Sequence, residues 1–437
     1  MSASLDAAIG AAARAWVLMK RDGLTLEAGL SALPQDDDQV RAAAQSLLYA
    51  TVRCRHRVSH VLSKLVRRAP RPLVLGILEV ALSLACEGRE NAFTVVNEAV
   101  RAVKQAGELG SAGLVNAVLR GFLRARQAFE ADFAADPVLR FEVPRWWYER
   151  VKTDRPADYE KILSSQARKP RLVLRVNARR ITIEDYLETL ERAGLPAFAL
   201  GGRAVCLEKP VPVERIPGFA QGLCSVQDAA SQLAADFLAV APGARVLDAC
   251  AAPGGKACAL LEARDVELTA MDVEARRCAM IRENLDRLGL KARVVCADAT
   301  DGQVLAGEPP FDAVMLDAPC SASGIVSRHP DIVHMHRPED IDALARRQDA
   351  LLEELWKRLK PGGALLYSTC SVFAAEGPER TSAFLAGHAD AASEALPGFD
   401  VPELALAPED DEADARLPRI HDGFYYFLLR KKGIGHD

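Results

Sequence analysis

Apolar side chains in the first 128 residues recur at the spacing of α-helices. Phe93, Val96, Val100 and Val103 follow one another at intervals of three or four residues, which places them on one helix face. The same periodicity runs through residues 11–21, 40–55, 58–67, 73–86 and 114–122. No segment repeats another, so we predict one all-helical bundle over residues 1–128.

Residues 129–228 carry a mixed pattern. Helical spacing at 146–151 and 183–193 alternates with strand-like runs at 171–177 and 205–207. We predict a small α+β module here, either a separate domain or an extension of the domain that follows.

Short apolar runs alternate with helical segments over residues 229–434. The runs lie at 245–248, 267–271, 292–296, 311–316, 364–368 and 424–429. This alternation predicts a mostly parallel, doubly wound sheet of the Rossmann-like α/β class. The acidic stretch 408–415 has little apolar content and is predicted to be a loop.

Composition places the chain among cytoplasmic multidomain proteins. Its 437 residues exceed what one hydrophobic core usually serves, so we expect two or three domains. No apolar stretch approaches the ~18–20 residues of a membrane span, and the start of the chain lacks the pattern of a signal peptide. The 10 cysteines include no Cys-x-x-Cys pair, which argues against structural zinc and a disulfide framework.

Charge is unevenly distributed. The chain carries −5 overall, whereas residues 1–130 hold 17 Lys and Arg against 12 Asp and Glu. Six arginines gather between positions 53 and 71, namely Arg53, Arg55, Arg57, Arg67, Arg68 and Arg71. Such a cluster suits a phosphate backbone or a solvated helix face, and composition favours neither.

The first predicted strand after residue 229 ends in the glycine-rich turn Asp248–Lys256. A turn between strand and helix lets a ligand approach the backbone closely. The glycine spacing is neither that of a Walker loop nor G-x-G-x-x-G, which disfavours nucleoside triphosphates, nicotinamides and flavins.

Aspartates end each of the first four of these strands, at Asp248, Asp272, Asp298 and Asp317. Parallel strand ends meet at the ligand-binding edge of such sheets, where Asp272 is placed for a ribose and Asp298 for an adenine amino group. S-adenosylmethionine fits an acidic pocket of this kind because its sulfonium and ammonium groups are cationic. The predicted cofactor-binding residues are Cys250, Ala251, Ala252, Pro253, Gly254, Gly255, Lys256, Asp272, Asp298 and Asp317.

Two cysteines follow strands at the same predicted edge. Cys320 ends the segment Leu316–Cys320, and Cys370 lies in the segment Tyr367–Ser371. Most cysteines are inert buried thiols, but a thiolate at a ligand-binding edge is able to act as a nucleophile.

These motifs resemble those of a known family. Segments 248–256, 317–321 and 369–371 resemble the motifs of RNA cytosine-5 methyltransferases of the Sun type, as do 227–232 and 328–331. Segments 96–100 and 114–120 resemble the NusB-like RNA-binding bundle, a resemblance that spans about residues 5–126. Together these resemblances imply methylation of C5 of a specific cytosine in small-subunit ribosomal RNA.

The resemblance also implies individual roles. Cys370 is the implied nucleophile that adds to cytosine C6, and Cys320 the residue that helps resolve the covalent adduct. Asp317 is expected to hydrogen-bond the base N3, to contact S-adenosylmethionine, or both. The chain departs from the usual Glu-Glu-Asn-like segment after Ser371, which weakens any role for Glu376 or Glu379.

Other residues carry weaker expectations. Lys256 is either near a bound anion or solvated, and Arg328 and His329 contact RNA or position their loop. The helix around Arg346–Asp349 is expected to support the site and to contact cofactor or RNA. The pair His334 and His336 lacks further ligands, so we predict no metal.

Two alternatives stay open at this point: the same chemistry on transfer RNA or large-subunit RNA, and a non-catalytic RNA-binding antitermination factor. We expect a monomer.

Overall fold

The computed structural model describes residues 4–35, 37–88, 90–408 and 416–433, which form two compact units. The helical unit combines residues 1–149 with the later segment 326–335. The sheet unit comprises residues 150–325 and 336–437. No helix in the described ranges has the length and apolar content that a membrane span requires.

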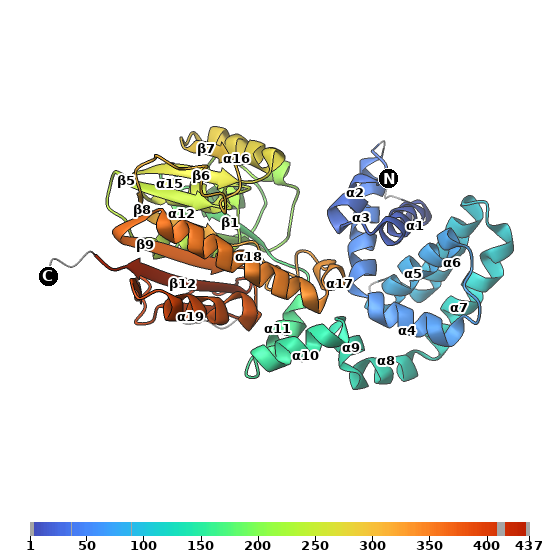
Figure 1. Cartoon of the computed structure of the whole chain (residues 1–437). Coiled ribbons are helices and arrows are strands. Elements are labelled where there is room, and N and C mark those ends of the chain that lie inside the picture. Colours follow the sequence, from blue (N-terminus) through green and yellow to red (C-terminus); the bar gives the residue numbers. More distant parts are fainter. Residues whose placement is uncertain (1–3, 36, 89, 409–415, 434–437) are drawn as a thin grey trace. The chain divides into compact units, whose positions relative to one another are not determined.

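The helical unit is built from helices alone in its described part, as the periodicity predicted (Figure 1). Its elements are α1 (Leu5–Asp22), α2 (Leu26–Ser31), α3 (Asp38–Arg53), α4 (Arg55–Leu65), α5 (Pro72–Glu87), α6 (Ala92–Gln105), η1 (Leu109–Ser111), α7 (Ala112–Arg124), α8 (Arg126–Ala135), α9 (Pro137–Phe141) and α17 (Ile332–Met335).

Small residues allow the central helix α1 to approach its neighbours closely. Ala8, Ala12 and Ala13 are fully buried. A Cβ on Gly76 of α5 would lie 2.9 Å from Val17 Cγ2 and 3.1 Å from the Ala13 carbonyl oxygen. The alanine-rich sequence of α1 therefore reflects close helix packing.

Segment 326–335 packs within the helical unit although it follows a strand of the sheet unit in sequence. Asp331 accepts a hydrogen bond from the Leu26 N–H at the start of α2, at 2.8 Å. Arg53 donates to the Ser327 carbonyl at 2.8 Å. The His334 ring lies 5.1 Å from the ring of His56. The segment that contains Arg328 and His329 is thus held by α2, α3 and α4.

The sheet unit contains a small antiparallel sheet of order β2-β3-β1-β4. Its strands are β1 (Leu172–Val176), β2 (Ala197–Gly201), β3 (Ala204–Leu207) and β4 (Cys224–Val226). Helices α10 (Arg145–Asp154) and α11 (Tyr159–Gln166) precede it, and α12 (Ile183–Arg192) packs Tyr186 and Leu190 against its core. The sequence predicted β1, β3 and α12 but not β2 and β4. β4 has only three residues and β2 leaves most of its residues partly or fully exposed, so neither shows a clear period.

The larger sheet has the order β10-β12-β9-β8-β5-β6-β7, with β11 beside β12. Its strands are β5 (Ala244–Ala249), β6 (Val266–Asp272), β7 (Arg293–Cys296), β8 (Phe311–Asp317), β9 (Leu359–Thr369), β10 (Ala391–Ser393), β11 (Glu403–Leu406) and β12 (Phe424–Lys431). Strands β5 to β9 pair in parallel, whereas β12 runs antiparallel to β9. The six predicted strands are present, and the short strands β10 and β11 were not predicted.

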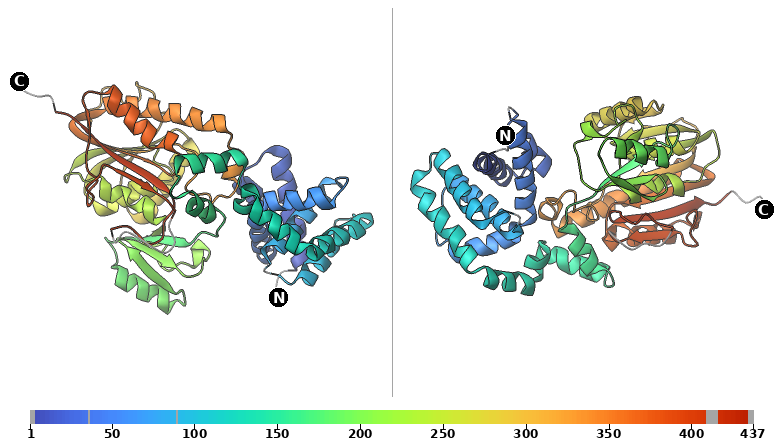
Figure 2. Two further views of the ribbon diagram at one scale, coloured as in Figure 1. Left: turned by 90° about the horizontal axis from the view of Figure 1, so that it is seen from below. Right: turned by 180° about the vertical axis from the view of Figure 1, so that it is seen from behind.

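Helices cover both faces of this sheet, as Figures 1 and 2 show. Helices α13 (Ala229–Gln232), α14 (Ala234–Phe237), α15 (Gly255–Ala263) and α16 (Ala275–Leu288) lie on one face, and α18 (Pro338–Lys357), η3 (Ala374–Glu376) and α19 (Pro378–Gly387) on the other. Successive residues such as Val246 and Leu247 enter opposite cores, since side chains alternate along a strand. Residues 409–415 of the predicted acidic loop lie outside the described residues.

Candidate active site

The carboxyl ends of the parallel strands are level with one another. Asp272 at the end of β6 pairs with Cys296 on β7, and Asp317 at the end of β8 pairs with Ser368 on β9. The segments after these strands therefore emerge along one edge, where open α/β sheets bind their ligands.

A cavity of about 220 Å³ opens at this edge. Seven of the predicted site residues line it: Cys250, Ala252, Asp272, Asp298, Asp317, Cys320 and Cys370. Arg277 and Arg347 also contribute to its wall. Arg347 belongs to the helix expected to support the site, whereas Arg277 was not predicted. Strand topology thus brings together cysteines and carboxylates that are up to 120 positions apart in sequence.

The glycine turn lies beside this cavity and lines it with Cys250 and Ala252. Its Ala251 N–H donates to the Met271 carbonyl at 2.8 Å, and its Ala252 N–H donates to Asp272 Oδ2 at 3.2 Å. Gly254 has φ +99°, a left-handed conformation that favours glycine. The predicted residues Ala251, Pro253, Gly254 and Gly255 shape the turn but do not line the cavity.

Lys256 is buried and paired. Its Nζ donates to Asp317 Oδ2 at 2.7 Å and lies 5.0 Å from the centre of the Phe424 ring. Burial alone would lower the pKa of Lys256, but Asp317 outweighs burial and raises it. The ammonium is therefore a fixed positive charge beside Asp317. Of the two alternatives for Lys256, the one in which it is solvated is wrong.

Two strand-end aspartates have opposite electrostatic character. Burial, followed by the nearby charge of Asp317, raises the pKa of Asp248 well above its usual range, and neither Asp248 oxygen has a hydrogen-bond partner in the described structure. Hydrogen bonds from the Thr300 N–H and hydroxyl, together with Arg347, lower the pKa of Asp298. Asp298 is thus an ionised acceptor at the cavity, whereas Asp248 lies beneath it.

The two cysteines face each other. Cys320 Sγ lies 3.5 Å from Cys370 Sγ. The hydrogen bond with Cys370 and burial raise the pKa of Cys320 well above its usual range, and the charge of Glu376 adds to the effect. Cys320 is therefore held as a thiol next to Cys370.

Helix α18 supports the site as expected from the sequence. Arg347 donates to Asp298 at 3.2 Å, and Gln348 Nε2 donates to the carbonyl of Pro319, the residue before Cys320, at 2.9 Å. Asp349 pairs with Arg380 of α19 at 2.7 Å.

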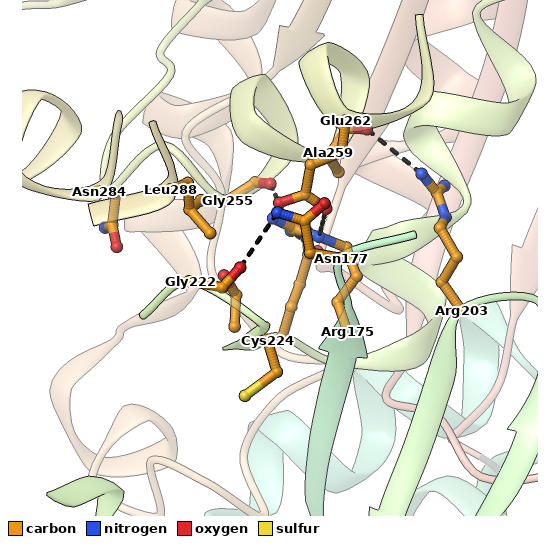
Figure 3. A network of polar contacts seen from close by, with 12 residues as sticks. Arg175, Asn177, Arg203, Gly222, Cys224, Gly255, Ala259, Glu262, Asn284 and Leu288 are labelled. Atoms are coloured by element: carbon orange, nitrogen blue, oxygen red, sulfur yellow. Dashed lines mark hydrogen bonds and ion pairs between the residues drawn. The ribbon is translucent and has the colours of Figure 1, made fainter. Parts of the chain in front are cut away.

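The small sheet is joined to helix α15 through Arg175 (Figure 3). Arg175, on β1, is 1% exposed and donates to both oxygens of Glu262 on α15 at 2.8 Å. Its Nη1 also donates to the Gly255 carbonyl in the first turn of α15 at 2.8 Å, and to Gln227. The module of residues 129–228 thus braces the helix that follows the glycine turn. Arg175 gave no signal in the sequence beyond its place in a strand.

The predicted histidine pair does not assemble into a metal site. His334 packs against His56 in the helical unit, while His336 belongs to the sheet unit. The described residues contain no cluster of three or more His, Cys, Asp or Glu arranged to hold a metal ion.

Comparison with known proteins identifies the family of the chain. Three family profiles match in order: "NusB family" at residues 11–124, "Methyltr_RsmF/B-like, ferredoxin-like domain" at 143–214, and "16S rRNA methyltransferase RsmB/F" at 235–430. "Ribosomal RNA small subunit methyltransferase B" of Pseudomonas putida is 39% identical over 96% of this chain and 98% of its own length. The chain belongs to the RsmB/F family.

Solved structures agree with this fold. "Crystal Structure of PH0851" covers 98% of this chain and 99% of its own, with a TM-score of 0.76 at 24% identity. "The crystal structure of NSun6 from Pyrococcus horikoshii with SFG" covers 66% of this chain and 98% of its own, with a TM-score of 0.55 at 19% identity. The arrangement of a NusB-like bundle, a ferredoxin-like module and a Rossmann-like methyltransferase domain is thereby confirmed for this RsmB/F member.

Proposed function

We propose that this chain transfers a methyl group from S-adenosylmethionine to C5 of a cytosine in 16S ribosomal RNA, through a covalent bond between Cys370 and C6. By resemblance the target is cytosine 967. Membership of the RsmB/F family supports methylation of small-subunit RNA. The observation that carries the chemistry is a pair of thiols 3.5 Å apart at a cavity with strand-end carboxylates.

The residues at the cavity suit S-adenosylmethionine. Asp272, Asp298 and Asp317 line it, and each is paired with a cation of the chain: Arg277 at 3.5 Å, Arg347 at 3.2 Å and Lys256 at 2.7 Å. Their oxygens are thereby held in place to accept hydrogen bonds from the hydroxyl and amino groups of a nucleoside. When bound, the cofactor supplies a methyl group activated by its sulfonium. Asp272 and Asp298 would hold the nucleoside part, and the glycine turn would lie against it.

Cysteine is needed because cytosine C5 is a poor nucleophile. Attack of the Cys370 thiolate on C6 forms an S–C6 bond and pushes the electrons of the C5–C6 double bond toward C5 and the ring. The electron-rich C5 would then take the methyl group, while the bond between methyl and sulfonium breaks and leaves a neutral thioether. A base removes the C5 proton, the C5–C6 double bond reforms, and the S–C6 bond breaks to return the thiolate.

Charged residues beside the thiols would assist these steps. Asp317 accepts hydrogen bonds from Lys256 at 2.7 Å and Ser368 at 3.1 Å, so its carboxylate is held in one orientation. In this position it would bind the base edge and stabilise charge that develops on the ring. Cys320, held as a thiol, would assist release of the adduct.

A methylation assay tests this proposal. The full chain is incubated with S-adenosylmethionine and 16S RNA, transfer RNA or 23S RNA, and new 5-methylcytosine is mapped by bisulfite sequencing. We expect one new site, in 16S RNA, and none with Cys370→Ala. A site only in transfer RNA or 23S RNA would support the alternative substrates, and RNA binding without any new 5-methylcytosine would support a non-catalytic factor.

A further inference from the structure

We propose that Glu376 is a positioning residue that holds together the loops of Cys320 and Cys370, so that both thiols contact the same base. The inference rests on the proposed function and adds a residue to it. Glu376 ends the short turn η3 and is 0% exposed. It belongs to the segment that departs from the family pattern, so the sequence offered no reason to choose it.

The Glu376 carboxylate joins the residues that directly follow the two cysteines. Ser321, after Cys320, donates its N–H to Oε1 at 2.8 Å and its hydroxyl to Oε2. Ser371, after Cys370, donates its hydroxyl to Oε2 at 2.6 Å. One carboxylate thus fixes both loops, although they lie 50 positions apart in sequence.

Neighbouring contacts make this tie rigid. Gln348 donates to Glu376 Oε1 at 3.3 Å and to the Pro319 carbonyl at 2.9 Å, so the Cys320 loop is held on both sides of the cysteine. The Glu376 carbonyl accepts from the Tyr367 hydroxyl at 2.9 Å and the Thr369 hydroxyl at 3.2 Å, at the end of β9. The carboxylate, its carbonyl and the two loops therefore form one buried network.

The charge of Glu376 matters as well as its reach. Its carboxyl oxygens accept four hydrogen bonds, from the Ser321 N–H and hydroxyl, the Gln348 amide and the Ser371 hydroxyl, and these bonds would stabilise a carboxylate charge. That charge adds to the hydrogen bond with Cys370 and to burial in raising the pKa of Cys320. Glu376 would therefore help to keep Cys320 protonated while it lies against the nucleophile.

Two substitutions separate reach from charge. Glu376→Gln keeps the length and removes the charge, and Glu376→Asp keeps the charge and shortens the reach. Ser371→Ala removes one arm of the tie only. Glu379→Gln is the matched control, because Glu379 lies three positions further on and its side chain is 55% exposed.

The first measurement needs no RNA. Ellman's reagent oxidises two adjacent thiols to a disulfide and is itself reduced to two thionitrobenzoate anions, and peptide mass spectrometry then identifies the Cys320–Cys370 bond. We expect wild type and Glu379→Gln to pair at equal rates, Glu376→Asp to pair about 10-fold more slowly, and Ser371→Ala to lie between them.

The second measurement follows alkylation of Cys320 against pH. Glu376→Gln should shift this profile to lower pH, whereas Glu376→Asp should leave it near wild type. A purely structural role would not separate the two variants in this way.

The third measurement is single-turnover methylation of 16S RNA, well below the melting temperature of each variant. We expect Glu376→Gln and Glu376→Asp to slow the chemical step by about 10–100-fold, with the RNA concentration for half-maximal rate within about 2-fold of wild type.

The inference is overturned if both Glu376 variants pair their thiols and methylate as wild type does. It is also overturned if their rates fall only in proportion to the fraction unfolded. If wild type itself methylates no RNA, the proposed function fails, while thiol pairing and the pH profile still decide whether Glu376 positions the cysteines.

Discussion

The six arginines between positions 53 and 71 and the strand-end aspartates of the sheet unit are both sets of like charge, but they differ in what they contact. Four of the six arginines make contacts inside the helical unit. Arg53 donates to Ser327, and Arg55 lies 5.9 Å from the Trp16 ring. Arg57 binds Glu142 and the Leu139 carbonyl, and Arg71 pairs with Glu108.

The aspartates instead converge. Asp272, Asp298 and Asp317 line one cavity because the strands that precede them end at one edge. Arginines spread over two helices and the segment after them meet different neighbours, whereas residues at parallel strand ends share a single direction. Position in the fold, more than charge itself, separates a structural cluster from a chemical one.

The largest effect is expected at the sheet edge, from Cys370→Ala. Loss of the proposed nucleophile should reduce methylation by at least about 10⁴-fold, because the thiolate that would attack C6 is gone. Incorporation of labelled methyl groups into 16S RNA measures this effect. Residual activity above one-hundredth of wild type would contradict the role of Cys370.

Cys320→Ala should also stop turnover, but after the bond to RNA has formed. The expected product is a covalent protein–RNA complex that runs as a slow band in a denaturing gel. The double variant Cys320→Ala/Cys370→Ala should lack this band. A band from Cys370→Ala instead would reverse the two assignments.

The buried ion pair of Arg175 and Glu262 lies away from the candidate site, and its loss should lower the free energy of unfolding. Arg175→Met leaves Glu262 buried without its partner, which should cost about 3–5 kcal/mol in the free energy of unfolding. Urea denaturation followed by circular dichroism measures this cost. Arg175→Met/Glu262→Met is the control and should recover most of the loss, whereas an equal loss in both variants would show that the charge pair is not the cause.

Glu142, which contacts Arg57 of the arginine cluster, should make the stability of the fold depend on pH. Burial raises the pKa of Glu142 to about 8, against hydrogen bonds from the His56 and Arg57 N–H groups. Because the folded pKa exceeds the unfolded one, this group stabilises the fold most below about pH 4.5, and that contribution is lost as pH rises toward 8.

Glu142→Gln removes this titration. Between pH 5 and 8 the wild type should therefore lose about 2–4 kcal/mol of stability relative to the variant. Thermal unfolding at several pH values tests the difference, and parallel curves for the two proteins would contradict it.

The smallest effect is expected from Arg67 and Arg68, two of the exposed arginines of the cluster. Arg67→Ala/Arg68→Ala should weaken binding of 16S RNA by up to about 10-fold and flatten its salt dependence, with the free energy of unfolding within about 0.5 kcal/mol of wild type. Lys64→Ala, an exposed site on the adjacent α4, is a control for general loss of charge. Unchanged affinity would identify the pair as solvated surface between α4 and α5.

Sequence reasoning reached much of the candidate site because periodicity marks where strands end. Each candidate residue lies at or shortly after the end of a predicted strand. The cavity is lined by five of them: Asp272, Asp298, Asp317, Cys320 and Cys370. Sequence reasoning could not reach Glu376, whose partners Ser321 and Ser371 are ordinary serines until the loops meet. A serine directly after each cysteine was the only available signal.

The sequence by itself determined the three successive folds, the strand ends at which the candidate cysteines and aspartates lie, and the family motifs. These features depend on local periodicity and turn residues, which neighbouring positions of the chain encode. Only the tertiary structure decided that Asp248 is buried without a hydrogen-bond partner among the described residues, that Lys256 pairs with Asp317, and that Arg175 binds helix α15. These contacts join residues 61 and 80 positions apart in the latter two cases, and no local pattern records such a distance. Burial and pairing of charges are therefore properties of the folded chain.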